Sequence, residues 1–311
     1  MENDKNTTKE KIRRITSIVV RVLLALFFLL LILSFLKIFW DCRYIRERKA
    51  IVEDTGYLYD EEDWDIIPDT VAPYEEDDVF DSLPKAVSLE QFFPPIGNQN
   101  PYGTCVVWAT GYNLTTALKA IKYHWTAEQL ADPANQVSPK DLWMGIESSS
   151  KGRGCEGTWY EPTFYVLTTT GAASMEHSPY KNLGNCSGTY YGDSTNVLRS
   201  YKHVVSSSGG MPTLDQIRAY ISDTIPLVIS THVGDRFMTW SGPSVLNQDT
   251  YLKPGQMHAY HAMVISGYDD SKNAFRVRNS WGEEWGDAGS IWVDYDFFMD
   301  QFCQAVFMAE K

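Results

Sequence analysis

Cysteine is scarce in this chain, and the cysteines present are not spaced for a zinc site. Five occur among 311 residues, and none forms a C-x-x-C pair. So few cysteines exclude a disulfide-rich scaffold, and the missing pairs exclude the common structural zinc sites. Because five is an odd number, at least one thiol has no partner within the chain. The count suits one reactive cysteine with at most one or two bridges.

Basic residues are also few, and one long segment has none. Lys and Arg number 27 against 40 Asp and Glu, so the formal net charge is −13, which argues against a nucleic-acid-binding protein. Residues 53–81 contain thirteen of the acidic residues and no Lys or Arg, so the rest of the chain is balanced in charge. Aromatic residues make up 14% of the chain, which excludes wholesale disorder. A nearly neutral globular part with a sizeable core therefore carries an acidic strip.

One long apolar run lies close to the N-terminus. A short basic tail, residues 1–14, precedes the apolar residues 15–40, which are long enough to cross about 30 Å of hydrocarbon at about 1.5 Å per residue. Arg21 and Lys37 within the run can reach the membrane interfaces. No small-x-small cleavage site follows Leu36, which favours an uncleaved signal anchor over a cleaved signal peptide. We expect one transmembrane helix, a cytoplasmic N-terminus and a single-pass protein whose large domain lies outside the cytoplasm.

An acidic stalk is expected to follow the anchor. Residues 41–82 mix charge runs with prolines and show no sustained helical or strand period. This pattern is typical of a solvated spacer. The alternative is an autoinhibitory segment that lies in an active-site cleft.

The globular part, residues 83–311, changes character along its length. Residues 105–170 contain helical patterns, whereas residues 225–295 are rich in strand patterns, as in 261–266 and 274–278. Helices first and strands later predict an α+β fold with segregated halves.

Cys105 lies at a position that favours a reactive thiol, the start of a predicted helix. It follows a loop that contains Pro101 and Gly103, and it opens a helical pattern. Few free thiols are ionised at neutral pH, because their pKa is near 8.5. The N–H groups and the positive dipole end of a helix N-terminus stabilise a thiolate. Cys105 is therefore either a nucleophile or a buried structural cysteine at the start of a helix.

His261 and Asn279 supply the groups that would activate this thiol. His261 starts an apolar strand, and Asn279 ends the next strand along the chain. If these strands are antiparallel neighbours, the Asn279 oxygen can accept a hydrogen bond from one imidazole nitrogen while the other nitrogen faces the thiol. This arrangement of nucleophile, base and orienting group is that of covalent acyl transfer. Trp281 would shield the His–Asn hydrogen bond from water.

Residues 83–311 resemble the papain-like cysteine peptidases. The motifs that carry the resemblance are Gln99 with the loop to Cys105, 137–142 (Val-Ser-Pro-Lys-Asp-Leu), 154–157 (Gly-Cys-Glu-Gly), 178–180 (Ser-Pro-Tyr), His261 and 279–282 (Asn-Ser-Trp-Gly). The Cys-x-x-Trp-Ala sequence after the loop is similar to that of bacterial and archaeal members. The resemblance implies a two-lobed fold, in which a cleft separates a helical lobe from an antiparallel β-barrel-like lobe.

The resemblance also implies a role for each matching residue. Cys105 would be the nucleophile, His261 the general base and then the general acid, and Asn279 the orienting group. Gln99 would form the oxyanion hole together with the Cys105 backbone N–H, and Trp281 would support the pair of His261 and Asn279.

Other matching positions concern the substrate cleft and the disulfides. Gly157, Thr158 and Tyr260 would line the cleft, although Thr158 stands where the family commonly has glycine. Tyr102 replaces a cysteine of the family's motif, so Cys155 either pairs with Cys186 or stays reduced.

The implied function is a cysteine-type peptidase that hydrolyses a peptide or protein substrate through a thioester. It needs no cofactor and no metal. Two alternatives share the fold. A transpeptidase or transamidase would pass the same thioester to an amine, and a non-catalytic binding module descended from a protease would have a damaged catalytic set.

Overall fold

The computed structural model describes residues 70–71, 83–206, 210–250 and 259–311. The expected tail 1–14 and the expected transmembrane helix 15–40 lie outside these residues, as does the expected stalk apart from Thr70–Val71. Within the part of the chain that the structure describes, no helix is long and apolar enough to cross a membrane.

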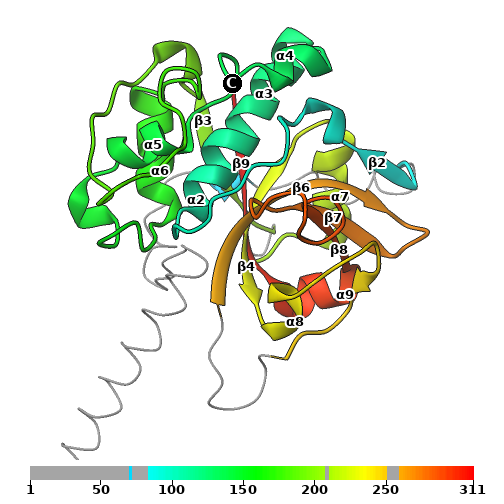
Figure 1. Cartoon of the computed structure of the whole chain (residues 1–311). Coiled ribbons are helices and arrows are strands. Elements are labelled where there is room, and N and C mark those ends of the chain that lie inside the picture. Colours follow the sequence, from blue (N-terminus) through cyan, green and yellow to red (C-terminus); the bar gives the residue numbers. More distant parts are fainter. Residues whose placement is uncertain (1–69, 72–82, 207–209, 251–258) are drawn as a thin grey trace, which may run out of the picture. The chain divides into compact units, whose positions relative to one another are not determined.

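Most helices precede most strands along the described chain (Figure 1). The helical elements are η3 (Glu90–Phe92), α2 (Cys105–Val107), η4 (Trp108–Thr115), α3 (Thr116–Tyr123), α4 (Ala127–Ala131), α5 (Pro139–Gly145), η5 (Ser148–Ser150), α6 (Tyr160–Thr169), η6 (Ser194–Asn196), α7 (Leu214–Ser222), α8 (Asp235–Met238), α9 (Tyr295–Phe297) and η7 (Phe298–Phe302). The strands are β1 (Thr70–Val71), β2 (Ala86–Ser88), β3 (Ser200–Val204), β4 (Leu227–Val233), β5 (Val245–Leu246), β6 (Ala259–Asp269), β7 (Ala274–Arg278), β8 (Ser290–Asp294) and β9 (Cys303–Glu310). The mixed α+β character expected from the sequence is confirmed.

The helical lobe is built around one long segment. Elements α2, η4 and α3 follow one another without a break, and η4 is a π-helical stretch. Every residue of η4 is buried, and α5 and α6 pack against it. Gly111 allows this close approach, because a Cβ at this position would lie only 2.7 Å from Leu142 Cδ2.

A buried carboxylate organises the loops beside this lobe. Helix α5 begins with Ser138 as its N-cap and Pro139 at its first position, a combination that favours a helix start. Two residues further on, the fully buried Asp141 accepts hydrogen bonds from the backbone N–H groups of Ala173 at 2.7 Å and Tyr191 at 2.9 Å. Its charge is thus satisfied by backbone donors, and the loops that carry these residues are fixed to α5.

The strands form one nine-stranded sheet in the order β1-β3-β9-β4-β6-β7-β8-β5, with β2 also paired to β6. The pairs are antiparallel except for β1 with β3 and β5 with β8. The strands expected at 261–266 and 274–278 lie within β6 and β7, which are antiparallel neighbours. The antiparallel pairing expected for the β lobe holds for six of the eight strand pairs among the described residues. Among the described residues the path of strands is open, and each of its ends is a parallel pair that contains a strand of only two residues.

A short strand lies within the expected stalk. Thr70 pairs with His203 and Val71 with Val204, in parallel orientation, so that β1 extends the sheet beside β3. The sequence pattern predicts no strand here. Two residues are too few to leave a period-two pattern, which explains why the strand was missed.

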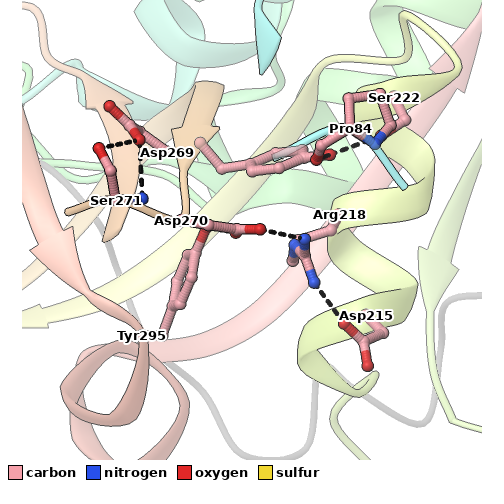
Figure 2. A network of polar contacts seen from close by, with 9 residues as sticks. Pro84, Asp215, Arg218, Ser222, Asp269, Asp270, Ser271 and Tyr295 are labelled. Atoms are coloured by element: carbon pink, nitrogen blue, oxygen red, sulfur yellow. Dashed lines mark hydrogen bonds and ion pairs between the residues drawn. The ribbon is translucent and has the colours of Figure 1, made fainter. Parts of the chain in front are cut away.

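A polar network fastens α7 to the turn that follows β6 (Figure 2). The Arg218 guanidinium contacts Asp215 and Asp270, each at 2.7 Å, and the Tyr295 hydroxyl donates to Asp270 at 3.0 Å. Asp270 thereby joins the turn to α7 through Arg218 and to the start of α9 through Tyr295.

Candidate active site

The thiol of Cys105 lies at the start of the central helical segment and against β6. Its side chain is 0% exposed. Burial raises the pKa of this thiol above its ordinary value, while the backbone N–H groups of Ala262, Val106 and Cys105 act in the opposite direction. Two of these groups belong to the helix start, as the sequence predicted. The third follows His261 directly in β6, so the thiol and the histidine strand meet at this point.

The imidazole of His261 is oriented by Asn279. His261 Nε2 lies 2.7 Å from Asn279 Oδ1. The backbone N–H of Ser280 donates to the same Oδ1 at 2.7 Å, which identifies this atom as the amide oxygen rather than the nitrogen. Because an amide oxygen only accepts hydrogen bonds, Nε2 must carry a proton. In the neutral imidazole, Nδ1 is then the basic nitrogen and can take the proton of a thiol.

Aromatic rings surround this pair of side chains. The rings of His261 and Trp281 have their centroids 4.8 Å apart, and the ring of Phe237 lies 5.5 Å from that of Trp281. His261 and Asn279 are 0% and 1% exposed. The hydrogen bond between them is therefore held in an apolar environment, which strengthens it.

Gln99 reaches the site from the loop that precedes the helix. Its backbone N–H donates to Ser280 O at 2.8 Å, and its Oε1 accepts from Ser280 Oγ at 2.7 Å. Its Nε2 donates to Tyr102 O at 3.1 Å. Since a carbonyl can only accept, the amide nitrogen of Gln99 faces the loop that leads to Cys105. An amide nitrogen in this position can donate to a developing oxyanion.

The residues expected in a substrate cleft lie in two places. Gly157 and Thr158 are buried, and the Thr158 hydroxyl donates to Ser150 O at 2.8 Å, so it is used within its own loop. The backbone of the preceding Glu156 forms an isolated β-bridge with that of Gly103. The loop of Gly157 and Thr158 therefore lies next to the loop that leads to Cys105. Tyr260 is half-buried beside His261 in β6.

The cysteines expected to form a possible disulfide are joined in the structure. Cys155 and Cys186 form a disulfide with their Cα atoms 5.4 Å apart. Tyr102, which replaces the cysteine of the family's motif, accepts a hydrogen bond at its hydroxyl from the Leu183 N–H at 3.1 Å. The loop near Cys186 is thus tied to the Cys105 loop by a tyrosine. Cys303 is a free and buried thiol.

Ligand groups for a metal are not gathered among the described residues. No three His, Cys, Asp or Glu side chains there are placed to hold an ion. The groups at the site are a thiol and an imidazole, which serve nucleophilic and acid–base catalysis, and two carboxamides, which donate and accept hydrogen bonds.

Three polar residues at the site were given no role by the sequence analysis. They are Thr104, Tyr180 and Ser280. Tyr180 and Ser280 belong to recognised motifs, which marks them but does not show what they touch. The contacts of Tyr180 and Ser280 with Gln99 join residues that are 81 and 181 positions apart in the chain, and no local pattern reports such a pairing.

Residues 86–305 match the family model described as papain family cysteine protease. Among curated proteins, zingipain-1 of Zingiber officinale is 23% identical over 203 residues, which cover 64% of this chain and 81% of the relative. Mexicain of Jacaratia mexicana is 24% identical over 198 residues, which cover 63% and 81%.

Solved structures show a similar fold. Xylellain, a cysteine protease from Xylella fastidiosa, superposes with a TM-score of 0.63 at 20% identity and covers 83% of this chain and 96% of its own. The bromelain protease from Ananas comosus, solved in complex with the E64 inhibitor, gives a TM-score of 0.55 at 21% identity, with coverage of 73% and 99%.

Proposed function

Because this chain belongs to the papain family of cysteine proteases and is a cysteine peptidase, we propose that it hydrolyses peptide bonds with Cys105, His261 and Asn279 as its catalytic residues. One observation carries the proposal. His261 Nε2 is held 2.7 Å from Asn279 Oδ1, and the residue after His261 offers its N–H to the Cys105 sulfur. A nucleophile, a base and an orienting group therefore meet within one site.

The first half of the reaction forms a thioester. His261 Nδ1 takes the proton of Cys105, and the sulfur attacks the carbonyl carbon of the peptide bond, whose oxygen becomes an oxyanion. The carbonyl then re-forms, the C–N bond breaks, and the His261 imidazolium gives its proton to the leaving amine. Asn279 accepts from Nε2–H throughout, which keeps the ring in place as it changes charge.

The second half releases the acid. A water molecule gives one proton to His261 and attacks the thioester carbon, and the C–S bond breaks as the carbonyl re-forms. Cys105 leaves as a thiol with the proton that His261 returns. In both halves the Gln99 amide and the Cys105 N–H donate to the oxyanion, and one such donor is typically worth about 10²–10³ in rate.

A pair of cysteine variants tests the assignment. Cys105→Ala should abolish both casein hydrolysis and covalent labelling by an epoxide of the E64 type, because the thiol that attacks is gone. Cys303→Ala is the matched control, since it removes the other free buried thiol among the described residues, and it should keep both activities. Labelling of the Cys105→Ala variant at the wild-type rate would refute Cys105 as the nucleophile.

We propose in addition that residues 15–40 anchor the peptidase in a membrane, with residues 1–14 in the cytoplasm and the catalytic domain outside it. The support is the length and apolar character of this run. The full chain should remain with the membrane fraction after washing at high pH, and the 41–311 form should be released. Release of both forms would argue against an anchor.

The acidic residues 41–82 are proposed to be a spacer. The support is the position of β1, which lies at an end of the sheet and is separated from β6 by β3, β9 and β4. At about 4.8 Å per strand spacing, Thr70–Val71 are about 19 Å from the His261 strand. We expect equal kcat/KM for the 41–311 and 83–311 forms. A faster 83–311 form would instead identify residues 41–82 as an inhibitory segment.

A further inference from the structure

The two donors of the proposed oxyanion hole lie at the two ends of the loop from Gln99 to Thr104. Gln99 opens the loop, and its side chain is one donor. Thr104 closes the loop, and the next backbone N–H, that of Cys105, is the other donor. The relative position of these two donors therefore depends on how the two ends of the loop are fixed.

One hydroxyl group contacts both ends of this loop. The Tyr180 hydroxyl lies 2.9 Å from Gln99 O and 2.6 Å from Thr104 Oγ1. A phenol has a single proton, and Gln99 O can only accept, so Tyr180 donates to Gln99. The Thr104 hydroxyl must then be the donor in the second contact. The single proton of the phenol thus determines the donor and the acceptor in both hydrogen bonds.

The contact of Thr104 has a further consequence for the helix. Thr104 is the N-cap of α2, a position at which a threonine hydroxyl usually accepts from a helix N–H. Here it makes no capping hydrogen bond and donates to Tyr180 instead. The N–H groups at the helix start are consequently left to the Cys105 sulfur and to an incoming oxyanion.

Packing holds the Tyr180 side chain in place. The ring of Trp108 lies edge-on at 4.8 Å and that of Tyr102 edge-on at 6.3 Å. Ser138 at the start of α5 donates to Ser178 O at 2.5 Å, which fixes the segment that carries Tyr180. Burial raises the pKa of Tyr180 to about 12, so the hydroxyl keeps its proton at working pH.

We propose that Tyr180 is a positioning residue whose hydroxyl fixes both ends of the Gln99–Thr104 loop, so that the Gln99 amide and the Cys105 N–H converge on the oxyanion. The proposal rests on the proposed hydrolytic function. Tyr180 touches neither substrate nor the reacting atoms in this scheme, and it acts through Gln99 and Thr104.

Tyr180→Phe in the full chain tests the proposal, because it removes the hydroxyl and keeps the ring. On a quenched peptide taken from a cleaved casein segment, kcat should fall about 10–100-fold, while KM should change less than about threefold. Alkylation of Cys105 by iodoacetamide, followed by mass spectrometry of its peptide, should keep the wild-type rate. In that reaction the sulfur displaces iodide from carbon and no oxyanion forms.

A matched tyrosine elsewhere controls for the loss of a hydroxyl as such. The Tyr268 hydroxyl likewise donates to a carbonyl, Pro84 O at 2.7 Å, and contacts a second hydroxyl, Ser222 Oγ at 2.8 Å. Tyr268→Phe should lower stability by an amount similar to Tyr180→Phe but leave kcat unchanged. An unchanged kcat in Tyr180→Phe would overturn the proposal, as would an equal loss of turnover and of alkylation.

Two further variants keep the test decisive. Thr104→Val breaks only the second contact and should lower kcat by a smaller factor, about 3–10-fold. Gln99→Ala combined with Tyr180→Phe should lose less than the product of the two single losses, because Tyr180 acts partly through Gln99. Independent, multiplying losses would count against the proposal. Turnover that survives Cys105→Ala would instead refute the hydrolytic function itself.

Discussion

Two carboxamide side chains, those of Asn279 and Gln99, are oriented by one serine. The backbone N–H of Ser280 donates to Asn279 Oδ1, and its hydroxyl donates to Gln99 Oε1, each at 2.7 Å. Ser280 therefore connects the group that orients His261 with the group proposed for the oxyanion hole. The sequence predicted a role for Asn279 and for Gln99 but none for Ser280. The contact of Ser280 with Gln99 joins residues 181 positions apart, and only the folded structure shows it.

The charge of the residue that orients His261 can be changed with little change in shape. Asn279→Asp keeps an oxygen that accepts from Ser280 N–H and from His261 Nε2–H. A carboxylate at 2.7 Å stabilises the imidazolium, so the His261 pKa should rise. His261 must be neutral to take the thiol proton, so its protonation sets the acidic limb of the pH profile for kcat/KM, and this limb should move to higher pH. An unmoved limb in Asn279→Asp would mean that another group, not His261, sets it.

At the scale of elements, one buried guanidinium joins the two lobes. Arg278 ends β7 next to Asn279 and is 4% exposed. It contacts Glu90 of η3 at 2.8 Å, Asn113 of η4 at 3.2 Å and the carbonyl of Pro94. Burial lowers the pKa of Arg278, and the charge of Glu90 acts in the opposite direction. The end of the strand that carries Asn279 is thus tied to the helical lobe.

Removing the partner of this guanidinium should destabilise the fold. Glu90→Ala leaves the Arg278 charge buried without its carboxylate, a change that costs about 3–5 kcal/mol for a fully buried pair. Because the Glu90 side chain is 35% exposed, we expect a smaller loss of about 2 kcal/mol in the free energy of unfolding, measured with urea. The control is Asp215→Ala, which leaves Arg218 its contact with Asp270 and should cost less than about 1 kcal/mol. Equal losses would contradict the role given to Arg278.

The same elements show what a sequence can and cannot predict. The helical period after Cys105 and the apolar strands 261–266 and 274–278 are local signals, and the structure contains α2, β6 and β7 at those places. The contacts of Asp141 and Arg278 are not local, because their partners lie 32 to 188 residues away. Charged residues on such elements look like ordinary surface positions until the fold buries them.

At the scale of the whole molecule, the last strand lies inside the sheet and ends beside the helical lobe. Strand β9 pairs with β3 and β4, and Lys311 follows it. Lys311 Nζ donates to Thr195 O at 2.7 Å and to Val197 O at 2.6 Å. Burial lowers the pKa of Lys311 to about 8, and the charges of Lys119 and Lys122 contribute in the same direction. The contact of the sheet with the helical lobe therefore includes a cluster of like charges.

This cluster should make the stability of the protein depend on alkaline pH. Between pH 8 and 10.5 the unfolded chain keeps the Lys311 proton that the folded chain has released, so the free energy of unfolding should rise with pH through this window. Below about pH 8 both states hold the proton and the destabilisation is constant. Lys311 is partly exposed, so solvent screening should limit the rise to about 1 kcal/mol.

Lys311→Met removes the titrating group and should flatten the rise. The free energy of unfolding in urea, measured at pH 8 and at pH 10.5, should increase by about 1 kcal/mol less in this variant than in the wild type. Other groups that titrate in this range contribute about equally to both proteins and cancel in the difference. Lys140→Met, which removes a positive charge from α5, should keep the wild-type rise. If Lys311→Met keeps the full rise as well, the charge cluster beside β9 does not govern alkaline stability.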